Sequence, residues 1–108
     1  MDKELKKIIQ KLYTGFQKAA DLGDSNAMYN LALCYENGEG IQKDQSKTVY
    51  WYQKAADLGH SDAMFNLGNC YDNGEGIEND QSKAVYWYQK AADLGDSDAL
   101  RQLERLLS

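Results

Sequence analysis

Residues 27–62 read AMYNLALCYENGEGIQKDQSKTVYWYQKAADLGHSD, and residues 63–98 read AMFNLGNCYDNGEGIENDQSKAVYWYQKAADLGDSD. The two stretches are identical at 28 of the 36 aligned positions. A repeat period of about 20–50 residues is typical of solenoids, in which each unit buries its apolar face against its neighbours. The duplication therefore predicts a stack of nearly identical units.

The period extends beyond the two complete copies. Residues 16–23 have the pattern of residues 52–59, and Ala99-Leu100 begins a further copy. These partial copies fill the rest of the 108 residues and leave no linker. We therefore predict a single domain over residues 1–108 with four parts: an N-terminal capping half-repeat at 1–26, a first repeat at 27–62, a second repeat at 63–98 and a C-terminal capping helix at 99–108.

Each unit is predicted to form two antiparallel helices. Leu67 and Tyr71 recur at helical spacing, and Gly74 and Gly76 can take the positive φ that ends a helix. Asp80 is a suitable N-cap for the second helix, because a carboxylate accepts bonds from unpaired backbone N–H groups. Large aromatic residues of the second helices are expected to pack in the core: Trp51, Tyr52, Trp87 and Tyr88. We expect an all-α, right-handed α-α superhelix of about six antiparallel helices.

The charge of the chain disfavours two classes of partner. The net charge is −5, which disfavours nucleic acid and anionic membranes, so we expect neither as a partner. No apolar run approaches the roughly 20 residues of a membrane span. Lysines among the apolar positions of residues 1–16 do not fit a signal peptide. We therefore expect a cytoplasmic protein.

The spaced residues of the second repeat carry a family pattern. They read Leu67-Gly68-x-x-Tyr71-x-x-Gly74-x-Gly76-Ile77-x-x-Asp80-x-x-Lys83-Ala84-x-x-Trp87-Tyr88-x-Lys90-Ala91-Ala92-x-x-Gly95. The first repeat has the same pattern, with Ala32 and Thr48 at two of these positions. The pattern resembles the Sel1-like repeat, a relative of the tetratricopeptide repeat. The resemblance implies a non-catalytic adaptor that holds other proteins on its concave surface.

In the related fold, the first helix of each unit lines a concave groove. The resemblance therefore implies a peptide-binding groove formed by Asn26, Tyr29, Asn30, Leu33, Glu36, Asp62, Phe65, Asn66, Asn69, Asp72, Asp98, Arg101 and Arg105. Carboxylates are frequent in this set, so the expected ligand is a basic or amphipathic segment of a protein or peptide. The alternative is an ordinary solvated face on a structural repeat scaffold that binds no ligand.

The sequence has no constellation of catalytic or cofactor-binding residues. His60, the single histidine, stands where the other turns have Asp24 and Asp96, so we interpret it as a helix N-cap. Cys34 and Cys70 lie one repeat apart, and equivalent residues of stacked helices are about 10 Å apart, beyond the reach of a disulfide. We interpret both as buried apolar residues, and we predict no enzymatic activity, no cofactor and no metal site.

The two ends depart from the repeat. Gly15 stands where the repeats have Trp, and Glu104 stands where the second repeat has Gly68. An unpaired carboxylate cannot be buried in a close helix contact, so we expect residues 99–108 to form a polar cap. In the first helix, apolar residues from Leu5 to Ala19 occupy one face and lysines lie mostly opposite, which predicts a cap with one partner side. The sequence is compatible with two origins: an excerpt of a longer repeat array with engineered caps, or a natural protein with degenerate end repeats. Because both ends are expected to be capped, we expect a monomer.

Overall fold

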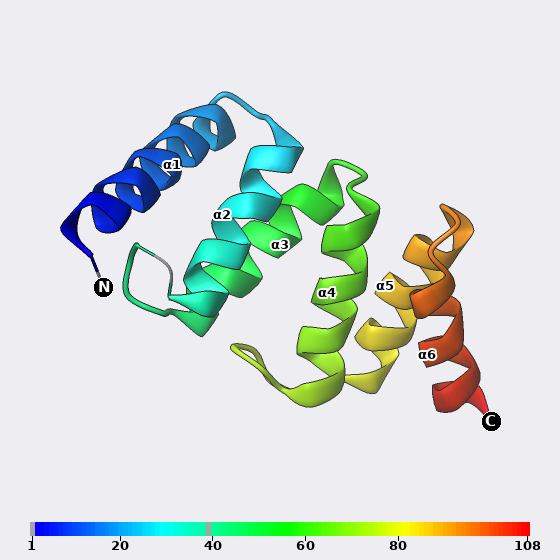
Figure 1. Ribbon diagram of the computed structural model, residues 1–108. Coiled ribbons are helices and arrows are strands. Elements are labelled where there is room, and N and C mark those ends of the chain that lie inside the picture. Colours follow the sequence, from blue (N-terminus) through cyan, green and yellow to red (C-terminus); the bar gives the residue numbers. More distant parts are fainter. Residues whose placement is uncertain (1, 39) are drawn as a thin grey trace.

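The computed structural model describes residues 2–38 and 40–108. In these two ranges the chain forms no strand and six helices: α1 (Lys3–Asp21), α2 (Ser25–Asn37), α3 (Gln45–Asp57), α4 (Ser61–Asn73), α5 (Gln81–Asp93) and α6 (Ser97–Leu107). Each helix contacts the next in an elongated stack with Cα extents of 49 × 24 × 21 Å and the chain ends at opposite ends (Figure 1). The predicted all-α superhelix is confirmed.

Local chemistry at the turns sets the helix boundaries. α5 begins after Asp80, whose carboxylate accepts the backbone N–H of Lys83 at 3.1 Å. α4 begins after His60, whose Nδ1 accepts the N–H of Ala63 at 3.2 Å, and ends before Gly74, the C-cap residue, which has a φ of 71°. The N-cap roles predicted for Asp80 and His60 are therefore confirmed.

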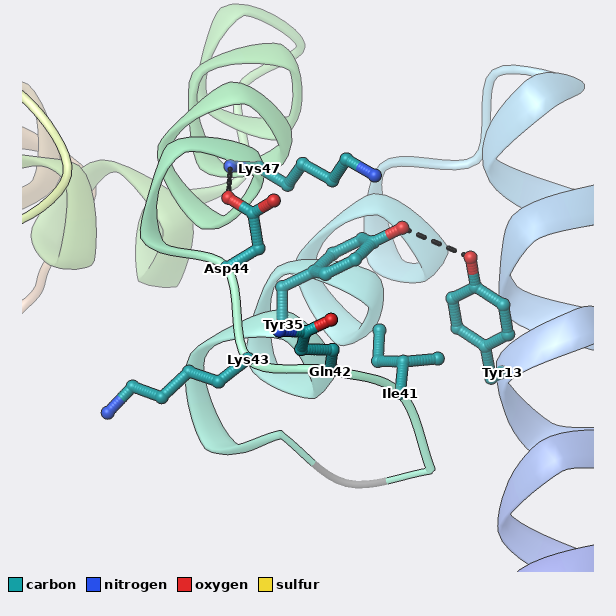
Figure 2. A pocket seen from close by; sticks show the side chains of 7 residues that line it. All are labelled: Tyr13, Tyr35, Ile41, Gln42, Lys43, Asp44 and Lys47. Atoms are coloured by element: carbon teal, nitrogen blue, oxygen red, sulfur yellow. Dashed lines mark hydrogen bonds between the residues drawn. The ribbon is translucent and has the colours of Figure 1, made fainter.

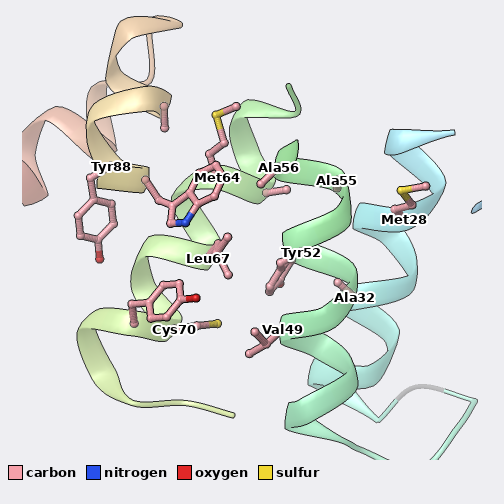
Figure 3. Close-up of a cluster of buried hydrophobic side chains, with 14 of the residues drawn as sticks. Met28, Ala32, Val49, Tyr52, Ala55, Ala56, Met64, Leu67, Cys70 and Tyr88 are labelled. Carbon is pink, nitrogen blue, oxygen red and sulfur yellow. The ribbon is translucent and has the colours of Figure 1, made fainter. Parts of the chain in front are cut away.

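The core runs along the stack, between the helices of each unit and between successive units. Tyr52 of α3 is completely buried, as are Leu31 of α2 and Leu67 of α4. Figure 3 shows Leu67 and Cys70 of α4 pointing toward Val49 and Tyr52 of α3. The predicted packing role of the large aromatic residues is confirmed, since all four lie in the core or pack against it: Trp51, Tyr52, Trp87 and Tyr88.

Glycines allow a close contact between successive units. A Cβ atom on Gly76 would lie 2.8 Å from the carbonyl carbon of Gln45 at the start of α3, and one on Gly40 would overlap Ile9 of α1. Ile9 and Gln45 are one 36-residue period apart, as are Gly40 and Gly76. The same contact therefore joins both pairs of units, and α1 occupies the place of a second helix in an incomplete first unit.

The two terminal helices differ from each other. Glu104 on α6 is exposed, as predicted for a polar cap. On α1, however, Leu5, Ile8 and Leu12 are exposed to 47, 57 and 53 %, although Phe16 of the same helix packs against the core. The prediction that the apolar residues of the first helix face a partner is wrong for these three, because α2 reaches only part of the apolar face of α1.

Candidate functional site

The predicted groove residues belong to α2, α4 and α6, the first helices of their units. The half-buried members of the set are Tyr29, Asn30, Leu33, Glu36, Phe65, Asn66, Asn69 and Asp72. The exposed members are Asn26, Asp62, Asp98, Arg101 and Arg105. Hydrogen bonds and ion pairs bring many of them together in two clusters, each organised around a tyrosine of a second helix.

The Tyr52 cluster consists of Tyr29, Glu36, Tyr52 and Asn66. The Tyr52 hydroxyl donates a hydrogen bond to Glu36 Oε2 at 3.0 Å. The same hydroxyl accepts one from Asn66 Nδ2 at 3.3 Å, and this nitrogen also lies 3.5 Å from the Tyr29 hydroxyl oxygen. The cluster therefore connects α2, α3 and α4 across two units.

Negatively charged side chains act on the tyrosines of the Tyr52 cluster. Burial, followed by the charge of Glu36, raises the pKa of Tyr52, so its hydroxyl keeps the proton that it donates to Glu36. Burial also raises the pKa of Tyr29, and the next contribution is the charge of Asp62. Within residues 2–38 and 40–108, neither Glu36 nor Asp62 forms an ion pair. Two uncompensated carboxylates thus act on the same tyrosine.

The Tyr88 cluster, formed by Asn69, Asp72, Tyr88 and Arg105, has a balanced charge. The Tyr88 hydroxyl donates to Asn69 Oδ1 at 2.6 Å and lies 3.3 Å from Asp72 Oδ2. Arg105 of α6 forms an ion pair with the same carboxylate. Burial and the charge of Asp72 raise the pKa of Tyr88. Asp72 is therefore neutralised across the boundary between two units.

The carboxylates of the predicted groove differ in whether they have a basic partner. On α6, Arg101 pairs with Asp98, as Arg105 pairs with Asp72. The arginines that replace Phe65 and Asn69 in the C-terminal helix therefore compensate two of the four carboxylates in the predicted groove, and the preference for a basic ligand stays a prediction.

Three residues that contribute to the site were not predicted as members of it. Tyr52 and Tyr88 were assigned to packing alone, but their hydroxyl groups organise both clusters. His60 was assigned to capping alone, but its ring stacks on Tyr29 with centroids 4.6 Å apart. A signal for the tyrosines was present in the sequence, since Phe16 fills the corresponding position of the incomplete unit and only the complete units have the hydroxyl.

A separate cavity of about 340 Å³ lies where α1 meets the first repeat (Figure 2). Tyr13 of α1 and Tyr35 of α2 face each other there, with their hydroxyl oxygens 3.0 Å apart. Burial and the Tyr13 hydroxyl raise the pKa of Tyr35 to about 12. None of the predicted groove residues lines this cavity, which we interpret as the joint that holds α1 on the first repeat.

Three further findings concern metal ions, membranes and thiols. In the part of the chain that the structure describes, no three His, Cys, Asp or Glu side chains gather as metal ligands, and none of the helices there has the length and apolarity to span a bilayer. Cys34 is half-buried, Cys70 is buried, and the two form no disulfide. Burial raises the pKa of the Cys70 thiol to about 12, so this thiol is protonated at neutral pH.

The Sel1 repeat model matches residues 16–24, 25–60 and 61–96, which together make up most of the chain. The chain belongs to the Sel1-repeat family. Sel1 repeats are in general protein-interaction modules and are typically not catalytic. The matched units begin two residues before our repeats at 27 and 63; a periodic chain has no unique first residue, so our division of the domain stays a prediction.

Solved structures share this fold. Cysteine-rich protein B of Helicobacter pylori is 35 % identical with a TM-score of 0.84, over 87 % of this chain and 71 % of that one. A Sel1 repeat protein from Oxalobacter formigenes is 35 % identical with a TM-score of 0.83, over 84 % of this chain and 26 % of that one. A protective antigen of uropathogenic Escherichia coli with an SLR fold is 33 % identical with a TM-score of 0.83, over 84 % and 20 %.

Among curated proteins, the similarity covers about one repeat unit. DAP3-binding cell death enhancer 1 of Rattus norvegicus is 54 % identical over 37 residues, and the protein of the same name from Mus musculus is 51 % identical over 37 residues. The match covers 34 % of this chain and only 7 % of the rat protein. This similarity therefore concerns the Sel1 unit and not the whole of those proteins.

Proposed function

We propose that the chain is a non-catalytic protein-binding module that holds a basic or amphipathic peptide segment on a concave face formed by its first helices. The observation that carries the proposal is the pair of uncompensated carboxylates, Glu36 and Asp62, beside the half-buried ring of Tyr29. The general role of Sel1 repeats in protein interactions supports it.

The side chains around this pair suit a peptide ligand. Tyr29 and Phe65 offer half-buried rings to apolar residues of the peptide. The amides of Asn66 and Asn69, which bond to Tyr52 and Tyr88 in the absence of a ligand, can also bond to a peptide backbone with their remaining donor and acceptor capacity. A lysine or arginine of the ligand is attracted by the charges of Glu36 and Asp62. The ligand therefore needs a basic residue next to an apolar one.

From the charge distribution of the groove we also propose an orientation for the ligand. Basic residues of the peptide lie over α2 and α4, where Glu36 and Asp62 are uncompensated. The arginines of α6 disfavour a basic residue at that end, because their charges repel it. A segment that is basic at one end and neutral or acidic at the other fits better than a uniformly basic segment.

Calorimetry with a pair of amphipathic peptides, one carrying lysines and one carrying glutamates at the same positions, tests this function. We expect the lysine peptide to bind more tightly, and its affinity to fall when salt is raised. Asp62→Asn is expected to weaken binding about three- to tenfold. Asp98→Asn is the matched control, because Asp98 holds the same place one period later and is already paired with Arg101. Equal losses in both variants, or no preference for the lysine peptide, contradict the proposal.

A ligand-free structural scaffold is the second candidate function. It is favoured by the internal hydrogen bonds of Asn66, whose amide is already engaged by Tyr52 and Tyr29. It predicts that peptides selected from a library show no enrichment over those selected on a chain with a scrambled groove. In either case we propose a monomeric cytoplasmic protein, in line with two cysteines that form no disulfide.

A further inference from the structure

The cavity between α1 and the first repeat has an unused hydrogen-bond donor in its wall. Tyr35 is only 8 % exposed, and its hydroxyl oxygen lies 3.0 Å from that of Tyr13. Two hydroxyls that share one hydrogen bond use only one of their two protons, and neither donates to another described residue. Tyr35 keeps its proton at neutral pH, because burial raises its pKa to about 12. The pair therefore has a proton to donate to a bound molecule.

The cation nearest to these hydroxyls has no acidic partner. Lys47 Nζ lies 5.3 Å from the centre of the Tyr35 ring, and Figure 2 shows this side chain extending toward the hydroxyl end of the ring, whereas Lys43 points away. Lys47 forms no ion pair with a described residue. Asp44, which also lines the cavity, accepts the backbone N–H of Lys47 at 3.1 Å, so the α3 N-terminus offsets its charge. An anion at the hydroxyls would thus be attracted by Lys47, and a cation would be repelled.

The same lysine and tyrosine also border a second, aromatic hollow. This hollow has a volume of about 450 Å³ and is lined by residues of α1, α2 and α3: Gln17, Tyr35, Ser46, Lys47, Tyr50 and Trp51. The rings of Tyr50 and Trp51 stand edge to face, with centroids 5.0 Å apart. Ligand sites commonly combine an apolar wall with a few polar groups that orient the ligand. Polar donors at one end and aromatic rings at the other suit a molecule that has an anionic group and an aromatic body.

The next boundary between units lacks this combination. Val49 stands one period after Tyr13 and is buried, so the boundary has no second phenol beside Tyr71, the equivalent of Tyr35. Lys83 lies over the Tyr71 ring at 5.5 Å, as Lys47 does over Tyr35. Residues 42–44 and 47 contain two lysines and one carboxylate, whereas the equivalent residues 78–80 and 83 contain one lysine and two carboxylates. The second boundary is therefore a natural control for the first.

We propose that the cavity between α1 and the first repeat binds the carboxylate of an aromatic carboxylic acid. The hydroxyls of Tyr13 and Tyr35 donate to the carboxylate oxygens, so two charge-assisted bonds replace their mutual neutral one. The ammonium of Lys47 compensates the charge, and the aromatic body of the ligand lies against Trp51. A small aromatic acid and the aromatic C-terminal residue of a peptide present the same chemistry. The site contains none of the groove residues, so it is independent of the function proposed above.

The two tryptophans, which are equivalent, give the test an internal control. An NMR titration of the full chain follows the indole N–H signals of Trp51 and Trp87 as phenylpropionate is added, with phenylpropionamide as the uncharged counterpart. We expect the acid to shift the Trp51 signal and not the Trp87 signal, and to bind at least about tenfold more tightly than the amide. N-acetylglycylphenylalanine, which has a free carboxylate, tests the peptide source. Binding of either acid at Trp51 supports the proposal, and the better ligand identifies the source.

Variants of the two boundaries locate the site. Lys47→Gln should weaken the binding of phenylpropionate at least about fivefold, because it removes the compensating charge. Lys83→Gln is the matched control and should have no effect. Tyr13→Val gives the first boundary the residue of the second and should abolish binding. Circular dichroism checks its fold; if the variant unfolds, Tyr13→Phe replaces it, with an expected loss of at least about threefold.

Four results would overturn the proposal. They are no shift of the Trp51 signal with either acid, equal binding of acid and amide, equal shifts of the two tryptophans, and equal losses in Lys47→Gln and Lys83→Gln. Failure of the lysine-peptide calorimetry would bear only on the groove.

Discussion

Replacement of Gly76 by alanine is expected to weaken the contact between units, and Gly74 offers a matched control. The two glycines lie in the same loop and have nearly the same backbone conformation, with φ of 72° and 71°. They differ in what surrounds them. Gly76 faces the backbone of Gln45 in the preceding unit, whereas Gly74 has only Asn79 of its own loop nearby.

The structure gives the expected magnitudes. A left-handed conformation costs a residue with a Cβ atom about 1–2 kcal/mol, and both variants incur this cost. At Gly74 the new Cβ would lie 3.5 Å from the nearest atom, an ordinary contact. At Gly76 it would lie 2.8 Å from the carbonyl carbon of Gln45 and still closer to its oxygen, so the backbone has to shift. Overpacking of this kind adds about 1–3 kcal/mol. We expect losses of about 1–2 kcal/mol for Gly74→Ala and about 2–5 kcal/mol for Gly76→Ala.

Urea unfolding followed by circular dichroism measures both losses, because the midpoint shifts in proportion to the free energy of unfolding at constant slope. A loss of 1 kcal/mol also lowers the melting temperature by about 4–8 °C in a domain of about this size. Equal destabilisation of the two variants would refute the reasoning. Such a result would mean that the loop of the second repeat does not contact α3. The assignment of α1 as a second helix, which depends on the equivalent contact one period earlier, would then lose its main support.

Three other predictions concern stability. Asp80→Ala removes the cap on the Lys83 N–H and should cost about 1 kcal/mol in urea unfolding. Tyr52→Phe removes the hydroxyl bonded to Glu36 and should cost about 1 kcal/mol in the same assay. Alkaline pH should destabilise the fold, because burial raises the pKa of Tyr35 to about 12 whereas unfolded tyrosine ionises near pH 10. Urea titrations at several pH values should show that the contribution of Tyr35 to the free energy of unfolding is unchanged below about pH 10 and falls toward pH 12.

Features that depend on residues close in the sequence, or on the duplication itself, were predictable from the sequence. Asp80 and Gly74 mark helix ends through bonds and conformations that involve only nearby residues, and both were assigned correctly. The stacking followed from the duplication, because two units with the same apolar faces have the same way to bury them. Local chemistry and periodicity together were therefore enough to give the fold.

Features that depend on side chains of different helices meeting were not predictable. The ion pair between Asp72 and Arg105 joins residues 33 positions apart on different helices, and nothing in the spacing indicates it. The hydrogen bond from Tyr52 to Glu36 depends on how far an aromatic ring extends through the core toward the surface of α2. Composition gave the total charge of the groove, but only the packing of α6 showed which carboxylates are compensated.

The two ends of the stack differ in a way that gives the chain a direction. A repeat protein made of identical units would expose matching faces at its ends and would extend by head-to-tail association, as heterologous contacts do. Glu104 is exposed on α6 at the place of Gly68, where even a Cβ atom would lie 2.7 Å from the ring of Tyr88. A carboxylate at this place disfavours the same close contact with a second copy. On α1, by contrast, Leu5, Ile8 and Leu12 are apolar and about half exposed. The two terminal helices therefore present different chemistry, with a carboxylate of α6 at the position of Gly68 and apolar side chains along α1, which a stack of identical repeats would not do.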